Sequence, residues 1–199
     1  DQLSRYLFAG KHARGELVQL QSCFQTMIAN HHYPQGVSQL LGELLVVTCL
    51  LTATLKFESE ISIQLQGDGP LAYMVINGNM IRDLINEDNN RQQVRGIAKL
   101  KHSSDVADFN QLKEALIGKG TMVITIRPKQ GEAYQGIVAL ENDTLADCLS
   151  HYFAVSEQIS TKIWLFVDVE KKLAAGSLLQ LLPNSDDKVQ QQQDFDHLS

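Results

Sequence analysis

The chain has 199 residues, of which 44% are hydrophobic and 20% charged, as is ordinary for a globular protein with a sizeable core. Its formal net charge of -6 argues against nucleic acid as the main ligand, because phosphate neutralisation requires clustered Lys and Arg. The longest apolar run, Leu44 to Leu55, is too short for a membrane span, and the N-terminus has no secretory signal. We therefore expect a cytoplasmic protein that binds neither nucleic acid nor membrane.

The first segment, Gln2 to Asn30, is predicted to be helical, with interruptions near Gly10 and Gly15. Its apolar residues Leu17, Leu20 and Phe24 recur at intervals of three and four, which is the helical period. Pro34 then starts a second helical segment, whose buried central part we place at Glu43 to Phe57.

A hairpin follows the central helix. Ile61, Ile63 and Leu65 alternate with polar residues, so they predict a half-buried strand. The segment Gly67-Asp68-Gly69-Pro70 predicts its turn, and Leu71 to Ile76 the returning strand. The next features are a turn at Asn77-Gly78-Asn79, a surface excursion from Met80 to Arg91, and a strand from Val94 to Leu100 with a bulge or close backbone approach at Gly96.

The second half repeats the alternation of helices and hairpins. Asp105 or Asp108 caps a short helix that Gly118 closes, and Thr144-x-x-Asp147 resembles a capping box before an apolar helical stripe. The predicted hairpins pair Thr121 to Arg127 with Tyr134 to Leu140, and Lys162 to Val167 with Leu173 to Leu182. The predicted fold class is α+β, with antiparallel or mixed sheets built from hairpins and packed with the central helix and further amphipathic helices.

The strand Lys162 to Val167 is apolar on both faces, so it needs cover on both sides. Trp164 and Phe166 share one face, and with Leu179 and Leu181 of the returning strand they form either ordinary core or a surface for apolar partners. After Leu182 the composition becomes polar and low in complexity, which predicts a linker over residues 183–199.

Signals for chemistry are weak. The three cysteines, Cys23, Cys49 and Cys148, lack the close spacing of zinc or redox motifs and are interpreted as core residues, and His31-His32 has no third ligand. We expect no metal or cofactor in this chain.

The sequence offers two enzymatic or ligand-binding interpretations. A phosphate loop at Gly67 to Pro70 is disfavoured, because Pro70 removes a donor and Asp68 places a negative charge at the anion position. Ser150-His151 with Asp194, Asp196 and His197 has no recognisable hydrolase setting. The chain is therefore expected not to be an enzyme.

Five segments point to one family: Arg14 to Val18, Glu43 to Pro70, Val94 to Ala98, Tyr134 to Val138 and Asp194 to Leu198. In this order they closely resemble the redox-regulated bacterial heat-shock chaperone family called the 33 kDa chaperonin. The TATLKF and QLQGDGP runs are the most specific part of this likeness.

The resemblance implies a cytoplasmic, ATP-independent holdase that binds unfolding proteins during oxidative stress and acts as a homodimer. It also implies a C-terminal zinc domain whose C-x-C and C-x-x-C cysteines form the redox switch, and none of those cysteines is present here. Residues 1–182 would then be the chaperone core and dimerisation domain, and residues 183–199 the start of the linker. The alternatives are a nucleotide-binding or other small-molecule-binding domain at Gly67 to Gly69, and a purely structural dimerisation domain in which residues 184–199 wrap onto a partner subunit.

Overall fold

The computed structural model describes residues 1–8, 11–29, 31–55, 58–81, 91–101, 116–182 and 188–198. Within these residues it has four helices and nine strands. The helices are α1 (Ser22–Ala29), α2 (Gln35–Thr54), α3 (Leu145–Val155) and α4 (Lys188–Leu198). The strands are β1 (Gln2–Phe8), β2 (Ala13–Leu20), β3 (Ser59–Gly67), β4 (Leu71–Ile81), β5 (Arg91–Leu100), β6 (Gly120–Pro128), β7 (Tyr134–Ala139), β8 (Thr161–Asp168) and β9 (Leu173–Leu181).

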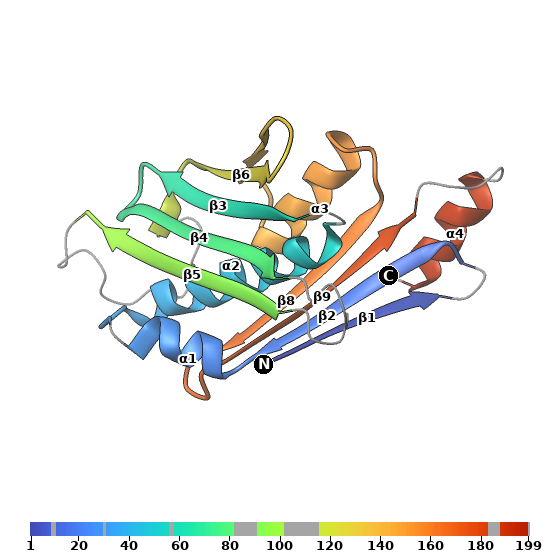
Figure 1. The fold of residues 1–199 in the computed structure, drawn as a ribbon. Helices are drawn as coiled ribbons and strands as arrows, with labels where there is room; N and C mark the ends of the chain where they lie inside the picture. The colour runs from blue at the N-terminus through green and yellow to red at the C-terminus, as the bar shows by residue number, and fades with distance from the viewer. Residues whose placement is uncertain are drawn as a thin grey trace.

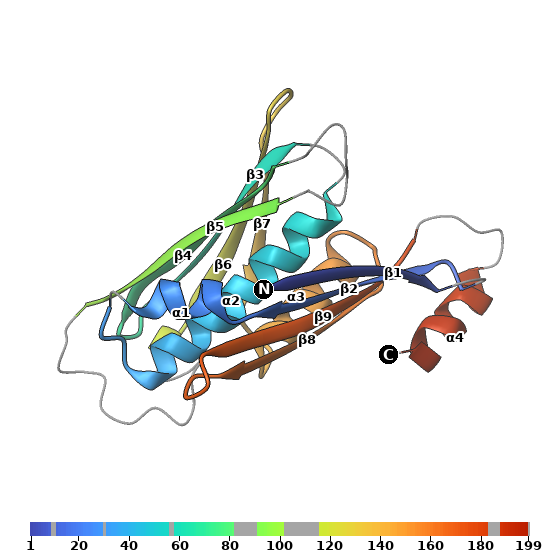
Figure 2. The same cartoon turned by 60° about the horizontal axis from the view of Figure 1, so that its bottom comes forward.

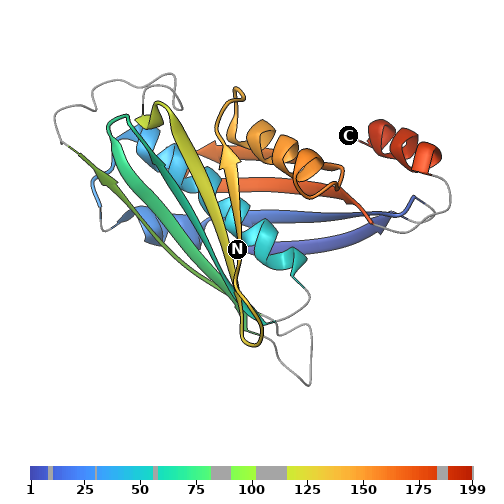
Figure 3. The ribbon, with the colours of Figure 1, turned by 90° about the horizontal axis from the view of Figure 1, so that it is seen from above.

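The strands form two antiparallel sheets with α2 between them (Figures 1 and 2). One sheet has the strand order β1-β2-β9-β8 and the other β5-β4-β3-β6-β7. Seen from above, the strands of the two sheets cross rather than run alongside one another (Figure 3). The α+β prediction is confirmed, and every strand pairing among the described residues is antiparallel.

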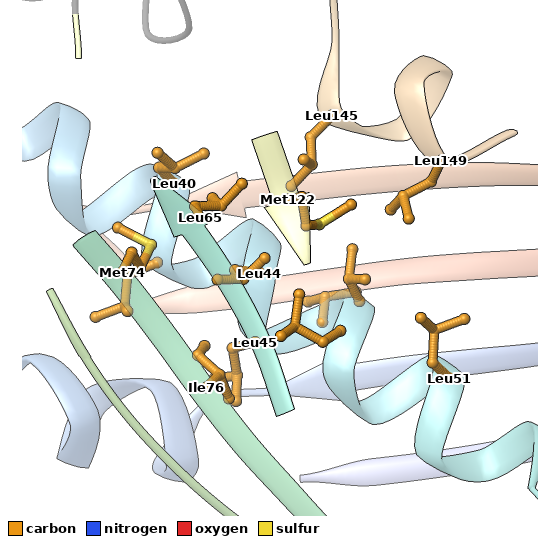
Figure 4. Packing of buried hydrophobic residues seen from close by; sticks show 14 of the residues in the cluster. Leu40, Leu44, Leu45, Leu51, Leu65, Met74, Ile76, Met122, Leu145 and Leu149 are labelled. Atoms are coloured by element: carbon orange, nitrogen blue, oxygen red, sulfur yellow. The ribbon is translucent and has the colours of Figure 1, made fainter. Parts of the chain in front are cut away.

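Helix α2 is the centre of the core. Its leucines meet apolar side chains of the five-stranded sheet and of α3, as Figure 4 shows for Leu44 and Leu45 beside Leu65, Ile76 and Met122. The hydroxyls of Thr48 and Thr52 donate to the carbonyls of Leu44 and Thr48, so these polar groups are satisfied inside the helix. The predicted central helix is confirmed, but it ends at Thr54 rather than Phe57.

By length and composition α2 could also cross a membrane. However, 89% of its most apolar window is buried inside the protein. We therefore assign α2 to the core.

The helix predicted over Gln2 to Asn30 is wrong. The segment forms the hairpin β1–β2, and only Ser22 to Ala29 is helical. Leu17 lies on one face of β2 while Val18 and Leu20 lie on the other, in the core. The helical spacing therefore arose by joining the end of a strand to the start of a helix.

The turn predicted at Asn77-Gly78-Asn79 is also wrong, because β4 continues through it to Ile81. A side chain at Gly78 would place its Cβ 2.9 Å from Cγ2 of Thr48 and 3.0 Å from Oγ1 of Thr52. Glycine is thus required here for close packing of β4 on α2. The predicted close approach at Gly96 is confirmed, since a Cβ there would lie 2.8 Å from Cγ1 of Ile76. The bulge between β4 and β5 lies elsewhere, because the register of this strand pair shifts between Leu71 and Tyr73.

Other predicted elements are confirmed. Gly67 to Pro70 is a hairpin corner, and β6–β7 and β8–β9 are hairpins. At the start of α3 the hydroxyl of Thr144 accepts a hydrogen bond from the backbone amide of Asp147. Gly118 has a φ of 66°, as expected of a closing glycine, but the helix capped by Asp105 or Asp108 lies outside the described residues. The excursion from Met80 to Arg91 also lies mostly outside them.

Within the segment predicted to be a linker, residues Lys188–Leu198 form helix α4. This helix lies at the far end of the four-stranded sheet from α1 (Figure 1). Phe195 is 6% exposed, and it packs in an apolar cluster with residues of the sheet. A single aromatic residue in a glutamine-rich segment is a weak sequence signal for a docked helix.

Candidate functional site

The four candidate surface residues lie on one face of the four-stranded sheet. In the antiparallel register Trp164 is opposite Ser177 and Phe166 is opposite Ala175, so both share a face with Leu179 and Leu181. The alternate residue Ile163 points the other way, into the core beside α2. We call the face turned away from α2 the outer face.

Helix α4 covers one end of the outer face. Phe195 forms a small apolar cluster with buried Ala13 and Leu179, and half-buried Phe8, Trp164, Leu181 and Leu198 pack against it. The hydroxyl of Ser160 also donates to Oε1 of Gln192 at 2.8 Å. Leu179 is therefore only 3% exposed, and it reaches solvent only if α4 moves.

The other end of the outer face is open. Phe166 is 64% exposed and Leu17 is 49% exposed. Leu17 is opposite Ser177, which is in turn opposite Trp164, so these side chains lie across neighbouring strands of one face. Large apolar side chains gathered on one open face are typical of a surface that binds apolar partners.

Tyr6 joins this surface from β1. Its ring lies over Gly15, where a Cβ would come within 2.2 Å of the ring, and its hydroxyl is 3.2 Å from Oγ of Ser177. The sequence prediction missed both Tyr6 and Leu17, because it assigned their segment to a helix. The signal that could have identified them is the alternation of Val18 and Leu20 with Leu17 and Gln19, which is a strand pattern.

The turn at Gly67 to Pro70 is not built as a phosphate cradle. The carboxylate of Asp68 accepts the amide of Lys119 at 2.7 Å, and the amide of Gly69 donates to the carbonyl of Ile117 at 2.8 Å. A Cβ at Gly67 would lie 2.1 Å from that same carbonyl oxygen, so the glycine serves a close backbone contact. The groups that would bind an anion are thus engaged within the protein.

Two of the candidate hydrolase residues, Ser150 and Asp196, lie on different helices. The hydroxyl of Ser150 donates to the carbonyl of Ala146 within its own helix, and Asp196 accepts the side-chain amide of Gln192 within α4. Ser150 and Asp196 therefore make bonds inside two separate helices.

The cysteines have the environment of core residues. Cys49 and Cys148 are buried and Cys23 is half-buried. Burial raises the pKa of Cys49 to about 12, with a further contribution from Cys23. Such a thiol is a poor nucleophile at neutral pH. In the described part of the chain no three His, Cys, Asp or Glu side chains are grouped as metal ligands.

A titratable carboxyl is buried on the inner face of the same sheet. Glu16 is 2% exposed, and its Oε2 has no hydrogen-bond partner among the residues that the structure describes. Burial raises the pKa of Glu16, while the charges of Arg14 and Arg5 oppose that increase. Arg14 in turn donates to Oε1 of Gln180 at 2.6 Å, so a polar row crosses the sheet beneath the outer face.

Comparison with known proteins gives a consistent result. The family model described as Hsp33 protein matches residues 1–199. A 33 kDa chaperonin of Colwellia psychrerythraea is 62% identical over 200 residues, covering 98% of this chain and 64% of that protein. Proteins of the same name from Pseudoalteromonas translucida and Edwardsiella ictaluri are 52% and 50% identical and cover the whole chain. The chain spans 66% and 63% of their lengths.

A solved structure shares the fold. The crystal structure of the 33 kDa chaperonin from Thermotoga maritima matches with a TM-score of 0.70 at 21% identity, covering 90% of this chain and 60% of that one. At this identity the likeness supports the fold alone. It agrees with the two-sheet α+β arrangement described above.

Proposed function

This chain belongs to the Hsp33 family, and from that premise we propose that it is the core of an ATP-independent holdase. In this role it binds unfolding proteins under oxidative stress and keeps them from aggregating, and it is not an enzyme. The observation that carries the proposal is the open apolar end of the outer face, where Phe166 is 64% exposed. The net charge of -6 favours solubility of the complexes formed there.

The apolar side chains of the outer face form two sets, one exposed to solvent and one covered by α4. Leu17, Tyr6 and Phe166 are available at the open end, whereas Leu179 and Leu181 lie in the cluster with Phe195. We propose that Trp164, Phe166, Leu179 and Leu181 contact clients or a partner subunit, the last two only after α4 leaves.

The remaining parts of the proposal follow from the family. Residues 1–182 act as the chaperone core and dimerisation domain of a cytoplasmic homodimer. Residues 183–199 begin the connection to a C-terminal zinc domain that holds the redox switch of the full-length protein. Within this chain, the environments of Cys23, Cys49 and Cys148 suit packing rather than switching.

Light scattering of a thermally unfolding client tests the chaperone proposal. The chain is expected to suppress aggregation without ATP and without an oxidant. Phe166→Ser should weaken the suppression, whereas Ile137→Ser should not, because Ile137 is equally exposed at 64% but lies on β7 of the other sheet. Absence of suppression at equimolar chain, or equal loss in both variants, would refute the proposal.

Sedimentation velocity tests the homodimer. The chain is expected to sediment as a dimer, and a chain ending at Pro183 shows whether the last residues contribute to the interface. A dimer that leaves client aggregation unchanged would instead favour a purely structural dimerisation domain. A monomer at all concentrations would contradict both.

A further inference from the structure

Two phenols and a carboxylate meet where α3 joins the two sheets. The strands β7 and β8 are edge strands of different sheets, and α3 packs against both of them (Figure 3). The hydroxyl oxygens of Tyr134 on β7 and Tyr152 on α3 are 2.6 Å apart. Both hydroxyls also lie within hydrogen-bond distance of Oε1 of Glu157, that of Tyr152 at 2.8 Å. We call these three side chains the tyrosine clasp.

The strand beneath the tyrosine clasp leaves room for the two hydroxyls. Tyr134 and Gly136 are two residues apart in β7, so they share one face of the strand. A Cβ at Gly136 would lie 2.1 Å from the hydroxyl oxygen of Tyr152 and 3.2 Å from that of Tyr134. A larger residue at this position would push the hydroxyl of Tyr152 away. Glycine therefore allows the two phenols to meet above the strand.

The phenols of the tyrosine clasp keep their protons at neutral pH. Burial, followed by the contact with Glu157, raises the pKa of Tyr134. Burial, followed by the contacts with Tyr134 and Glu157, raises the pKa of Tyr152. An electron can therefore leave either ring only together with its proton, and the Glu157 carboxylate is placed to accept that proton. Tyr134 is 43% exposed, so an oxidant in solution can reach the clasp.

The other three tyrosines of the chain have different surroundings. The hydroxyl of Tyr6 is 3.2 Å from Oγ of Ser177, and the hydroxyl of Tyr33 accepts the backbone amide of Ala98 at 3.2 Å. Within the described part of the chain, neither a carboxylate nor a second phenol is hydrogen-bonded to Tyr6, Tyr33 or Tyr73. The clasp thus combines two features that set it apart, a paired phenol and a proton acceptor.

We propose that the tyrosine clasp is an oxidative modification site, at which one-electron oxidants join Tyr134 to Tyr152 as a dityrosine cross-link. Each phenol gives one electron to the oxidant, and its proton passes through Glu157 to solvent. The two radicals then form a bond between the ring carbons next to their oxygens. Each ring becomes aromatic again when the hydrogen on that carbon moves to the oxygen. In total, two electrons and two protons are lost, and two equivalents of oxidant are reduced.

The geometry of the clasp suits this product. In a dityrosine the two oxygens flank the new bond, so they lie close together, as they already do at 2.6 Å in the clasp. The cross-link joins residues 18 positions apart in the chain and ties β7 of one sheet to the helix that packs on β8 of the other. The site lies apart from the outer face, so this inference does not depend on the proposed chaperone activity.

Photogenerated tris(bipyridine)ruthenium(III) is the probe oxidant, because it removes single electrons from phenols. The dilute chain should gain the blue fluorescence of dityrosine while keeping the mass of a single chain on a denaturing gel. Peptide mass spectrometry should find the peptides of Tyr134 and Tyr152 joined, with the loss of two hydrogen atoms. A cross-link that forms only between chains, or one that uses another tyrosine, would overturn the proposal.

Matched variants separate the clasp from general tyrosine oxidation. Tyr134→Phe keeps the ring and should abolish the fluorescence within single chains. Tyr6→Phe is the control and should leave it unchanged, because Tyr6 is similarly exposed, at 38%, but lies on β1. Glu157→Gln keeps the shape of the side chain without the proton acceptor, so it should slow cross-linking by at least about tenfold. Equal yields in Tyr134→Phe and Tyr6→Phe would refute the site, and an unchanged rate in Glu157→Gln would refute the route of the proton.

Discussion

Replacing Phe195 by alanine is expected to release α4 from the outer face while leaving the two sheets folded. Phe195 is 6% exposed and lies with half-buried Leu198 in the apolar cluster between the glutamine-rich helix α4 and the sheet. Burial of a phenylalanine side chain contributes about 1.5–3 kcal/mol. An isolated helix of 11 residues is marginal in water, so α4 depends on this contact to stay formed and docked.

Two measurements test this expectation. Hydrogen exchange should show loss of amide protection in α4 peptides of Phe195→Ala and unchanged protection in α2. Trp164 is the single tryptophan and packs in the Phe195 cluster, so its fluorescence should shift to the red. His197→Ala is the control, since His197 is exposed on the same helix. If Phe195→Ala leaves Trp164 emission unchanged, or lowers protection in α2 equally, the separate docking of α4 is refuted.

Three further predictions concern the stability of the fold. Glu16 has a folded-state pKa above its usual 4.5, so the folded chain binds this proton more tightly and loses stability as pH rises from about 4.5 through that higher value. Glu16→Gln should reduce the fall of the urea unfolding midpoint between pH 4 and pH 8. An unchanged pH dependence of the midpoint would contradict this prediction. Gly176→Ala should cost about 1–3 kcal/mol in urea unfolding, because its Cβ would lie 2.6 Å from the carbonyl oxygen of Trp164 and from Cγ1 of Val46. Thr144→Ala should cost about 1 kcal/mol through loss of the α3 cap, and Thr144→Ser should restore most of it.

The elements that could be predicted from the sequence are those whose signals are local. The alternation at Ile61 to Leu65, the cap at Thr144 and the glycine turn at Gly67 each depend on neighbours in the chain. Part of the candidate face could also be predicted from the sequence, because period-two alternation in Lys162 to Val167 places Trp164 and Phe166 on the same side of the strand. The extent of this face across the sheet could not be predicted, since it depends on which strands become neighbours.

The N-terminal hairpin was missed for a physical reason. The inner face of β2 carries Arg14 and Glu16 before Val18 and Leu20, so buried polar groups break the apolar alternation that would identify a strand. Burial of Glu16 depends on tertiary contacts that no local pattern encodes. The turn predicted at Gly78 was wrong for a similar reason, because this glycine allows β4 to pack closely on α2, which is a tertiary contact.

The partial cover of the outer face by α4 gives a quantitative expectation for client binding. If α4 is held chiefly by Phe195, with about 2.8 kcal/mol, the uncovered state is populated at about 1%. A client that binds only the uncovered face then has its apparent affinity reduced about a hundredfold, and Phe195→Ala should remove that reduction. A client that needs only Phe166 and Leu17, which are already open, should bind both forms alike. The ratio of affinities for the two forms therefore measures how much of the face beneath α4 each client uses.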